Sequence, residues 1–290
     1  MNIFKKLLGS KLCGYRQFAP VLAVSMFATH ADGQVLNHNN ASLSINTASG
    51  ASSWLVDGVN QLNQQWFWYR IGNGGPELPI QSISGSPIVT APFPGRSLDV
   101  KYVNATMSVD VLFMLGGGSA GSGNSTITET ISVKNLTAGS LDLHFFQYTD
   151  LNLVNTTANQ TVGFSIDGTG HYITTQALGS KTATEKLTSG YTTVSHIQAD
   201  STGQILAGLQ DGGSTTLSDV NSAGPAGDAS YAFQWDALLS PSGQAGEALP
   251  ISALITVVPE PSIFGLASAL SALYVFTANG RHRALKTVCK

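Results

Sequence analysis

The segment Gly116 to Asn124 (GGGSAGSGN) carries two spacings that are associated with chemistry in other proteins. Its glycines satisfy the GxGxxG pattern of dinucleotide-binding loops, and its first serine satisfies the GxSxG pattern of hydrolase nucleophiles. Either chemistry needs a helix directly after the loop, to aim backbone N–H groups at a phosphate or to seat the nucleophile. The next segment, Thr126 to Lys134, instead alternates apolar and polar residues as a strand does. We therefore predict a hairpin loop here, no catalytic residues and no enzyme.

Histidines and carboxylates could also hold a metal or act as acids and bases. The four histidines away from the chain ends are His38, His144, His171 and His196. They show neither HExxH nor another close ligand spacing, so we predict no metal site built on them. Asp150 and Asn152 supply only part of a calcium loop, which leaves calcium between loops open as a cofactor. Paired carboxylates that meet only in three dimensions keep a secreted hydrolase open as an alternative.

Aromatic residues offer a third chemistry, because their flat rings can stack on sugar rings. Trp66 to Tyr69 (WFWY) is the densest aromatic cluster, and in a strand its two tryptophans would share one face. The interpretation that we favour is a central strand buried on both faces, since aromatics in β proteins are mostly core. The alternative is a carbohydrate-binding module. Its candidate ligand-stacking residues are Trp54, Trp66, Trp68 and Trp235.

The elements that must position these side chains have the pattern of β-strands. Alternating runs rich in Thr, Ile and Val are separated by clusters of Gly, Asn and Ser. The runs cover 42–45, 98–103, 109–115, 126–134, 141–148, 162–166, 191–197, 231–237 and 251–257. Asp167 to Gly170 reads as a hairpin turn and Ser218 to Asp228 as a loop. This spacing is typical of an all-β fold, and we predict an antiparallel β-sandwich.

The composition excludes some functions and one kind of stabilisation. From Asp32 to Val258 there are six basic and 16 acidic residues, a formal charge of −10, so a basic surface for nucleic acid is absent. Cys13 and Cys289 both lie in the end segments, so no disulfide stabilises the part between them. That part must be held together by apolar burial and strand pairing.

The first 31 residues read as a signal peptide. Basic residues are followed by the apolar run Phe18 to Ala28, and small residues precede a cleavage position before Asp32. An uncleaved anchor is the alternative. A helix of 11 residues is too short, however, to cross an apolar bilayer core of about 30 Å at about 1.5 Å per residue. We predict cleavage and export, with residues 32–257 as the exported β-sandwich domain.

Residues 258–290 have three features in order. Pro259, Glu260 and Pro261 come first, an uncharged apolar run over 263–278 follows, and the basic residues Arg281 and Arg283 close the pattern. We predict that the run is a single transmembrane helix and that the basic end stays cytoplasmic, because positive charge flanks the cytoplasmic side of such helices. The preceding domain then lies outside the membrane, as the signal peptide also requires. A plain anchor helix behind a proline-rich linker is the alternative.

This order of features resembles the PEP-CTERM sorting signal of exosortase substrates. The resemblance covers about the last 30 residues; the tail Ala284 to Lys290 extends past the arginines where such signals commonly stop. It implies a membrane-held precursor that an exosortase cuts near the Pro-Glu-Pro motif. It also implies a host that makes extracellular polysaccharide.

Together these features predict an exported protein of the cell surface or extracellular matrix. We expect it to be membrane-anchored until an exosortase processes it, and to have a structural or adhesive role linked to exopolysaccharide or biofilm. The carbohydrate-binding module and the secreted hydrolase are the two alternatives. An exposed pair of coplanar aromatic rings would favour the first alternative, and a cleft with two carboxylates would favour the second.

Overall fold

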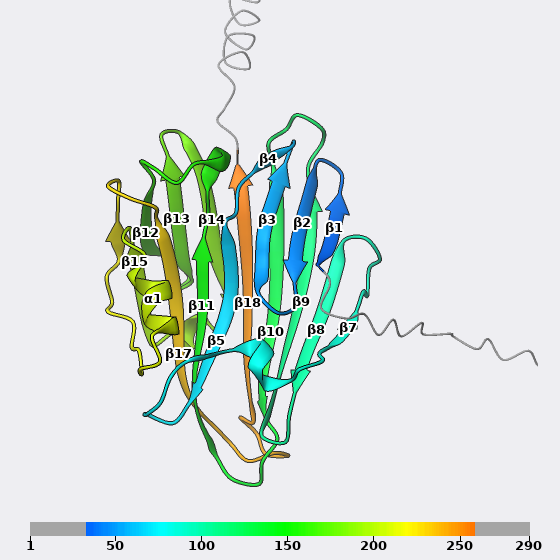
Figure 1. Ribbon diagram of the computed structural model, residues 1–290, viewed down its shortest axis with the longest axis vertical. Helices are drawn as coiled ribbons and strands as arrows, with labels where there is room; N and C mark the ends of the chain where they lie inside the picture. The colour runs from blue at the N-terminus through cyan, green and yellow to red at the C-terminus, as the bar shows by residue number, and fades with distance from the viewer. Residues whose placement is uncertain (1–32, 259–290) are drawn as a thin grey trace, which may run out of the picture.

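The structure, a computed structural model, describes residues 33–258, and these residues form two antiparallel β-sheets packed face to face (Figure 1). The predicted all-β sandwich is confirmed in class. The predicted signal peptide (1–31) and apolar helix (263–278) lie outside the described residues. Within residues 33–258, no helix combines the length and the apolar character needed to cross a membrane.

Sheet A has the order β1-β2-β3-β5-β11-β17-β15, with β4 paired to β3 and β6 paired to β5. Its strands are β1 (Gln34–His38), β2 (Ala41–Asn46), β3 (Gly50–Val56), β4 (Val59–Asn60), β5 (Gln64–Ile71), β6 (Leu78–Pro79), β11 (Leu141–Asp150), β15 (His196–Asp200) and β17 (Ser230–Leu239).

Sheet B has the order β16-β12-β13-β14-β18-β10-β9-β8-β7. Its strands are β7 (Ile88–Thr90), β8 (Ser97–Val103), β9 (Met107–Gly117), β10 (Ser125–Asn135), β12 (Thr161–Ile166), β13 (Tyr172–Leu178), β14 (Lys181–Ser189), β16 (Ser222–Ala223) and β18 (Ala248–Val258).

Alternation along β10 decides which side chains enter the space between the sheets. Residues 127, 129, 131 and 133 are buried, and those between them face solvent more openly. β10 pairs with β9 on one side and with β18 on the other over almost its whole length. The period of two therefore places an inward row of side chains on each of these three strands, and their burial holds the sheets together.

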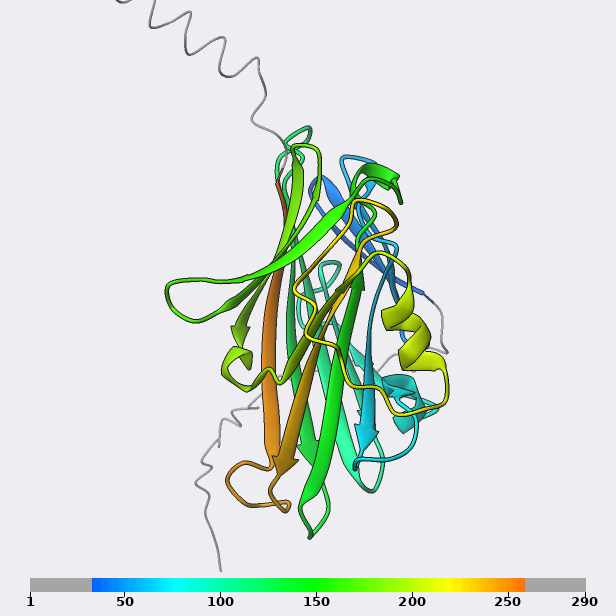
Figure 2. The same ribbon diagram turned by 90° about the vertical axis from the view of Figure 1, so that its left-hand side faces the viewer.

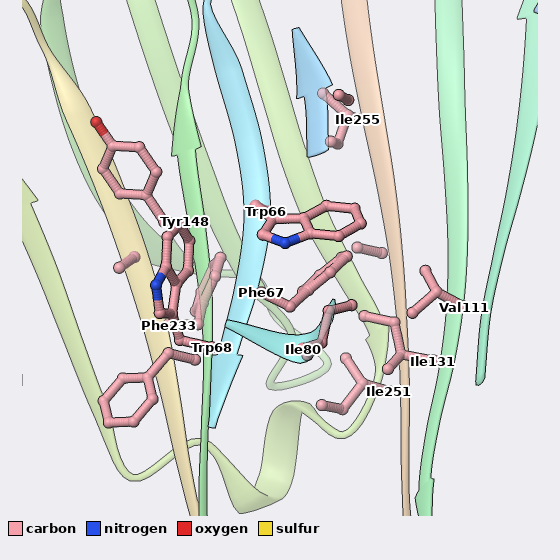
Figure 3. Close-up of a cluster of buried hydrophobic side chains, with 14 of the residues drawn as sticks. Trp66, Phe67, Trp68, Ile80, Val111, Ile131, Tyr148, Phe233, Ile251 and Ile255 are labelled. Carbon is pink, nitrogen blue, oxygen red and sulfur yellow. The ribbon is translucent and has the colours of Figure 1, made fainter. Parts of the chain in front are cut away.

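The central strands of sheet A are buried on both faces, as the WFWY pattern predicted. In β5, residues 65–70 are all buried, and in β11 residues 143–150 are. Phe67 points between the sheets toward Ile131 and Ile251, whereas Trp68 lies with Tyr148 on the opposite face of sheet A (Figure 3). An aromatic strand without a polar face therefore needs a cover on its outer side.

That cover includes the helix α1 (Gln204–Gln210), which lies on the outer face of sheet A and buries Ile205 and Leu209 (Figure 2). The 3₁₀ turn η1 (Ile80–Ile83) instead contacts β5 together with β8 and β9 of sheet B, and its Ile80 lies with Phe67 and Ile131 between the sheets (Figure 3). The carboxylate of Asp200 accepts the backbone N–H of Gln204 at 2.5 Å, so it satisfies a donor that the first helical turn leaves free. The sequence did not predict α1, because seven residues are too few to show a helical period.

One predicted strand is wrong over its first half. Residues 191–197 were expected to be extended, but Tyr191–Thr193 is the 3₁₀ turn η3, and β15 begins only at His196. The chain leaves sheet B after β14 and must cross to sheet A at this point. Gly190 makes the bend with a φ of 71°, and a Cβ there would lie 2.9 Å from the Pro250 carbonyl oxygen.

The two turn predictions agree with the structure. Residues 167–170 join β12 to β13, which pair as an antiparallel hairpin. Residues 218–228 are a loop apart from the two residues of β16, which pair with β12.

Candidate functional site

All four candidate stacking tryptophans are buried. The exposed fractions are 0% for Trp54, 1% for Trp66, 2% for Trp68 and 0% for Trp235. The indole N–H of Trp54 donates to the Ser125 hydroxyl at 3.0 Å, and that of Trp235 donates to the Gly190 carbonyl at 2.8 Å. An open ring face, which a flat stacking platform needs, is therefore missing at these four positions. The core interpretation fits them better.

Trp66 and Trp68 nevertheless border a pocket of about 320 Å³ on the outer side of sheet A. Its other walls come from the β2–β3 turn, from η1, from β6 and from the end of α1. The polar side chains around it are Ser49, Gln64, Glu77, Gln81 and Gln210. Aromatic edges beside amides and a carboxylate suit a small hydroxyl-rich molecule better than a large apolar one.

Glu77 in this pocket wall is neutralised by the protein itself. Its Oε1 forms a buried ion pair with Arg70 and accepts the backbone N–H of Thr215 at 2.8 Å. Arg70 also donates to the Thr215 carbonyl at 2.7 Å, so the pair ties β5 to the loop after α1. The other carboxylate oxygen of Glu77, Oε2, has no hydrogen-bond partner among the described residues.

Two glutamates that sequence reasoning missed meet between the sheets. Glu129 of β10 and Glu185 of β14 lie on either side of β18, and each is 0% exposed. The amide Nε2 of Gln147, from sheet A, donates to Glu129 at 3.0 Å and to Glu185 at 2.7 Å. The hydroxyl of Tyr231 also donates to Glu185 at 2.7 Å. The sequence pattern could have revealed Glu129, because it occupies an inward-facing position of the strictly alternating strand.

Burial governs the charge of this pair. Removal from water, with the negative charge of Glu185 as a second cause, raises the pKa of Glu129 well above its usual range. Burial also raises the pKa of Glu185, to about 7, although hydrogen bonds from Tyr231, Thr149 and Gln147 act in the opposite direction. A glycosidase needs two carboxylates at a cleft. This pair is sealed in the core, so it does not support hydrolysis.

A second carboxyl pair lies on an open surface. Burial and the neighbouring Asp110 of β9 raise the pKa of the Asp99 carboxyl, on β8, to about 6. Both side chains are on the outer face of sheet B, and Lys101 approaches Asp110 at 3.6 Å. Neither acid belongs to the pocket beside Trp66.

The histidines serve as local structural groups. His144 Nδ1 lies 2.5 Å from Asp236 Oδ1, and His196 Nδ1 lies 2.9 Å from Asp219 Oδ2. The first contact joins β11 to β17, and the second, with backbone N–H bonds from Ile197 and Leu217, fastens the 217–220 segment to sheet A. His38 Nδ1 accepts the backbone N–H of Gly117 at 2.8 Å. Within residues 33–258, no three His, Cys, Asp or Glu side chains gather to hold a metal ion.

The glycine-rich segment is a hairpin loop between β9 and β10, as predicted. The carboxylate of Asp57 accepts the backbone N–H groups of Gly121 at 2.6 Å and Gly123 at 2.8 Å. Gly117 is required for close approach, because a Cβ there would lie 1.9 Å from the His38 carbonyl oxygen. Through these contacts the loop links the two sheets at one end of the sandwich.

The sorting residues Pro259, Glu260, Pro261, Arg281 and Arg283 lie outside the described residues. The last described residue is Val258, at the end of β18.

Comparison with known proteins finds no matching family model and no similar curated protein. A bacterial glucoamylase crystallised in complex with acarbose superposes with a TM-score of 0.54 at 6% identity, over 81% of this chain and 35% of its own. A putative aldose 1-epimerase from Escherichia coli K12 superposes with a TM-score of 0.45 at 10% identity, over 78% of this chain and 98% of its own. This chain thus spans about a third of the glucoamylase chain, and that likeness shows the fold alone. The epimerase superposition is too loose to carry an argument.

Proposed function

We propose that this chain is an exported, exosortase-processed protein of the cell surface or extracellular matrix, with a structural or adhesive role linked to exopolysaccharide. The observation that carries the proposal is the ordered set of terminal signals: a leader over 1–31, the Pro-Glu-Pro motif, the apolar run 263–278 and the arginines after it. The described sandwich fits between these signals, because its first strand begins at Gln34 and its last ends at Val258.

The geometry of the sandwich supports a role exerted through its surface. Its tryptophans are core residues, and its inter-sheet carboxyl pair is sealed from solvent. The hydrolase alternative finds no support in that arrangement, so no catalytic role is proposed.

The test is intact mass and cell fractionation of the protein from its native host, with and without the exosortase. The expected mature species lacks residues 1–31 and everything after about Pro261. It leaves the cytoplasmic membrane only when the exosortase is present. A species that keeps 263–290 in both strains would refute the sorting proposal and leave a membrane-anchored β domain.

Carbohydrate binding is a second candidate, and the pocket beside Trp66 and Trp68 favours it. The glucoamylase that shares the fold acts on carbohydrate by its name, which makes glycans the first ligands to try. The matched variants are Ser49→Trp, which places a large ring at the exposed rim of the pocket, and Ser49→Ala, which leaves it open. Binding to the host polysaccharide should fall roughly tenfold in Ser49→Trp alone, the ratio for about 1.4 kcal/mol. Equal binding by both variants would rule out this pocket.

A further inference from the structure

Four oxygen-bearing side chains converge where β11 ends and β17 begins. Asp150 of β11 pairs directly with Ser230 of β17, so both side chains lie on the same face of sheet A. Asn152 follows Asp150 by two residues and Asp228 precedes Ser230 by two residues, so both lie just beyond the paired strand ends. The charge of Asp228 acts on Asp150, which confirms that the two acids are near each other. The result is an array of side chains that combines the DLN triplet with a DAS triplet.

The oxygens of this array lack donors. Asp150 Oδ1, Asn152 Oδ1 and Asp228 Oδ1 are buried without any hydrogen-bond partner among the described residues. The Ser230 hydroxyl makes no hydrogen bond of good geometry either, although it interacts with the Tyr148 hydroxyl. Asp150 is only 7% exposed, so bulk solvent has little access to its side chain. Buried acceptors without donors are costly, and several facing one another are a deficit of positive charge.

The second oxygen of Asp150 is held in place. Its Oδ2 accepts the side-chain N–H of Asn63 at 2.9 Å, and the Tyr148 hydroxyl lies 3.5 Å from it. The backbone N–H of Asn63 donates to the Asp150 carbonyl at 3.0 Å, which fixes the same loop to the strand end. This support fixes the Asp150 carboxylate through its other oxygen and leaves Oδ1 without a donor, as outer hydrogen bonds hold the ligands of metal sites.

Within residues 33–258, no lysine, arginine or histidine forms an ion pair with Asp150 or Asp228. The lysines and arginines in ion pairs within residues 33–258 are bound to Glu77, Asp110, Asp167 and Glu247. The array therefore differs from Glu77, whose buried charge Arg70 neutralises.

We propose that Asp150, Asn152, Asp228 and Ser230 bind a calcium ion. Two carboxylates match the charge of Ca²⁺, and an amide oxygen and a hydroxyl complete a set of hard oxygen ligands. Nitrogen and sulfur donors, which zinc prefers, are not part of the array. Ca²⁺ accepts six to eight ligands in irregular geometry, whereas Mg²⁺ demands a near-octahedral shell.

The calcium site deepens the proposed function and rests on its claim that the protein is exported. Outside the cell, calcium sites with a Kd of about 10⁻⁴–10⁻³ M are filled. Calcium would fasten the 151–153 segment and the loop before β17 to the sandwich. This role needs no exosortase, so the two proposals can fail separately.

The test measures calcium binding by the full chain in a polyoxyethylene detergent, after treatment with EDTA. Thermal unfolding at pH 7.5 is followed with CaCl₂ or MgCl₂ added. At a tenfold excess over Kd, Ca²⁺ should raise Tm by about 3–5 °C, and Mg²⁺ should raise it much less. Tb³⁺, which replaces Ca²⁺ and is sensitised by nearby aromatic rings, should luminesce beside Tyr148 and be displaced by Ca²⁺.

Asp228→Asn should weaken Ca²⁺ binding at least tenfold, because it removes one charge and keeps the shape. Ser230→Ala is the second variant, in case Asp228→Asn does not fold. Asp99→Asn is the matched control, since burial raises the pKa of Asp99 as it does that of Asp228, but Asp99 lies in sheet B. It should leave the calcium response unchanged. An absent calcium response, a response of equal size to Mg²⁺, or one that survives both array variants would overturn the proposal.

Discussion

The glutamate pair between the sheets and the Asp150–Asp228 array at the end of sheet A both contain buried acids, yet their surroundings differ. Around the glutamates the protein supplies neutral donors: Gln147 reaches both carboxylates, and Tyr231 reaches Glu185. Around the array, acceptors face acceptors. An oxygen without a donor also occurs at Glu129, so the distinguishing feature of the array is that oxygens without donors on three neighbouring residues gather there, which indicates a missing cation. Burial of a carboxylate alone therefore does not define a functional site.

Glu77 is the third member of this comparison, because there the cation is part of the chain. The first prediction concerns removal of that cation. Arg70→Ala should destabilise the protein by about 3–5 kcal/mol, since it leaves Glu77 buried without its partner. Chemical denaturation at pH 7 measures the loss. Lys101→Ala, at an ion pair with Asp110 that is about 40% exposed on both sides, should cost no more than about 1 kcal/mol.

The double variant Arg70→Met, Glu77→Leu sharpens the interpretation. If the loss comes from an unpaired charge, the double variant should recover most of it, because two apolar side chains replace a buried ion pair at little cost. A double variant as unstable as Arg70→Ala would show that packing of the guanidinium against the loop after α1, at Thr215, matters more than its charge.

The second prediction concerns the pH dependence that the glutamate pair imposes. The folded protein holds the Glu185 proton up to about pH 7, whereas the unfolded chain releases it near the ordinary value of 4.5. The stabilisation is therefore complete below about pH 4.5 and is lost as the pH rises through about 7. In EDTA, Tm should fall by several degrees across this window, as differential scanning calorimetry would measure.

Glu185→Gln isolates this contribution from the other acids. Glutamine resembles the protonated glutamate and carries no charge to bury, so the variant should unfold at a higher temperature than the parent above pH 7.5. Near pH 4.5 it should have no advantage. Parallel Tm profiles for variant and parent would contradict the assignment of the proton to Glu185.

How far the sequence predicts this molecule depends on the length of its patterns. β10 and β18 have long alternating runs, and the structure confirms them as strands. β5 was also correctly interpreted as a strand buried on both faces, because four consecutive aromatics leave no polar face. α1 and the η3 bend were not predicted. Both are set by tertiary demands, the cover over Trp68 and the crossing at Gly190, and neither spans enough residues to show a period.

The sites were harder to predict than the strands. Glu129 was detectable in principle, because it occupies an inward position, but its partner Glu185 comes from a distant strand. The DLN triplet alone is incomplete as a calcium loop. Its complement, Asp228 with Ser230, lies 76 residues or more away along the chain and joins only through the β11–β17 register. A single sequence gives no register between distant strands, so such convergent sites stay hidden.

The third prediction tests the donors that distinguish the glutamate pair from the array. Tyr231→Phe removes the 2.7 Å hydrogen bond to Glu185 and should cost about 1–2 kcal/mol. The same bond favours the charged form, so its loss should move the pH window of the second prediction upward. Thr149→Val, at a longer contact of 3.4 Å, is the control and should cost less. Equal costs would mean that packing, and not donation, stabilises the pair.

The last prediction concerns an exposed acid, Asp57, whose pKa is shifted in the direction opposite to that of the buried acids. Hydrogen bonds from Gly121, Asn40 and Gly123 lower the pKa of Asp57, which stays in water. Its contribution is therefore present above the ordinary value of 3.8 and is lost as the pH falls through the folded pKa, the reverse of Glu185. Asp57→Asn should lower Tm slightly at pH 6, and the difference should vanish in strong acid. If instead the deficit persisted at low pH, the carboxylate would hold the glycine loop by shape and not by charge, and donors alone would not explain the contrast between the two buried regions.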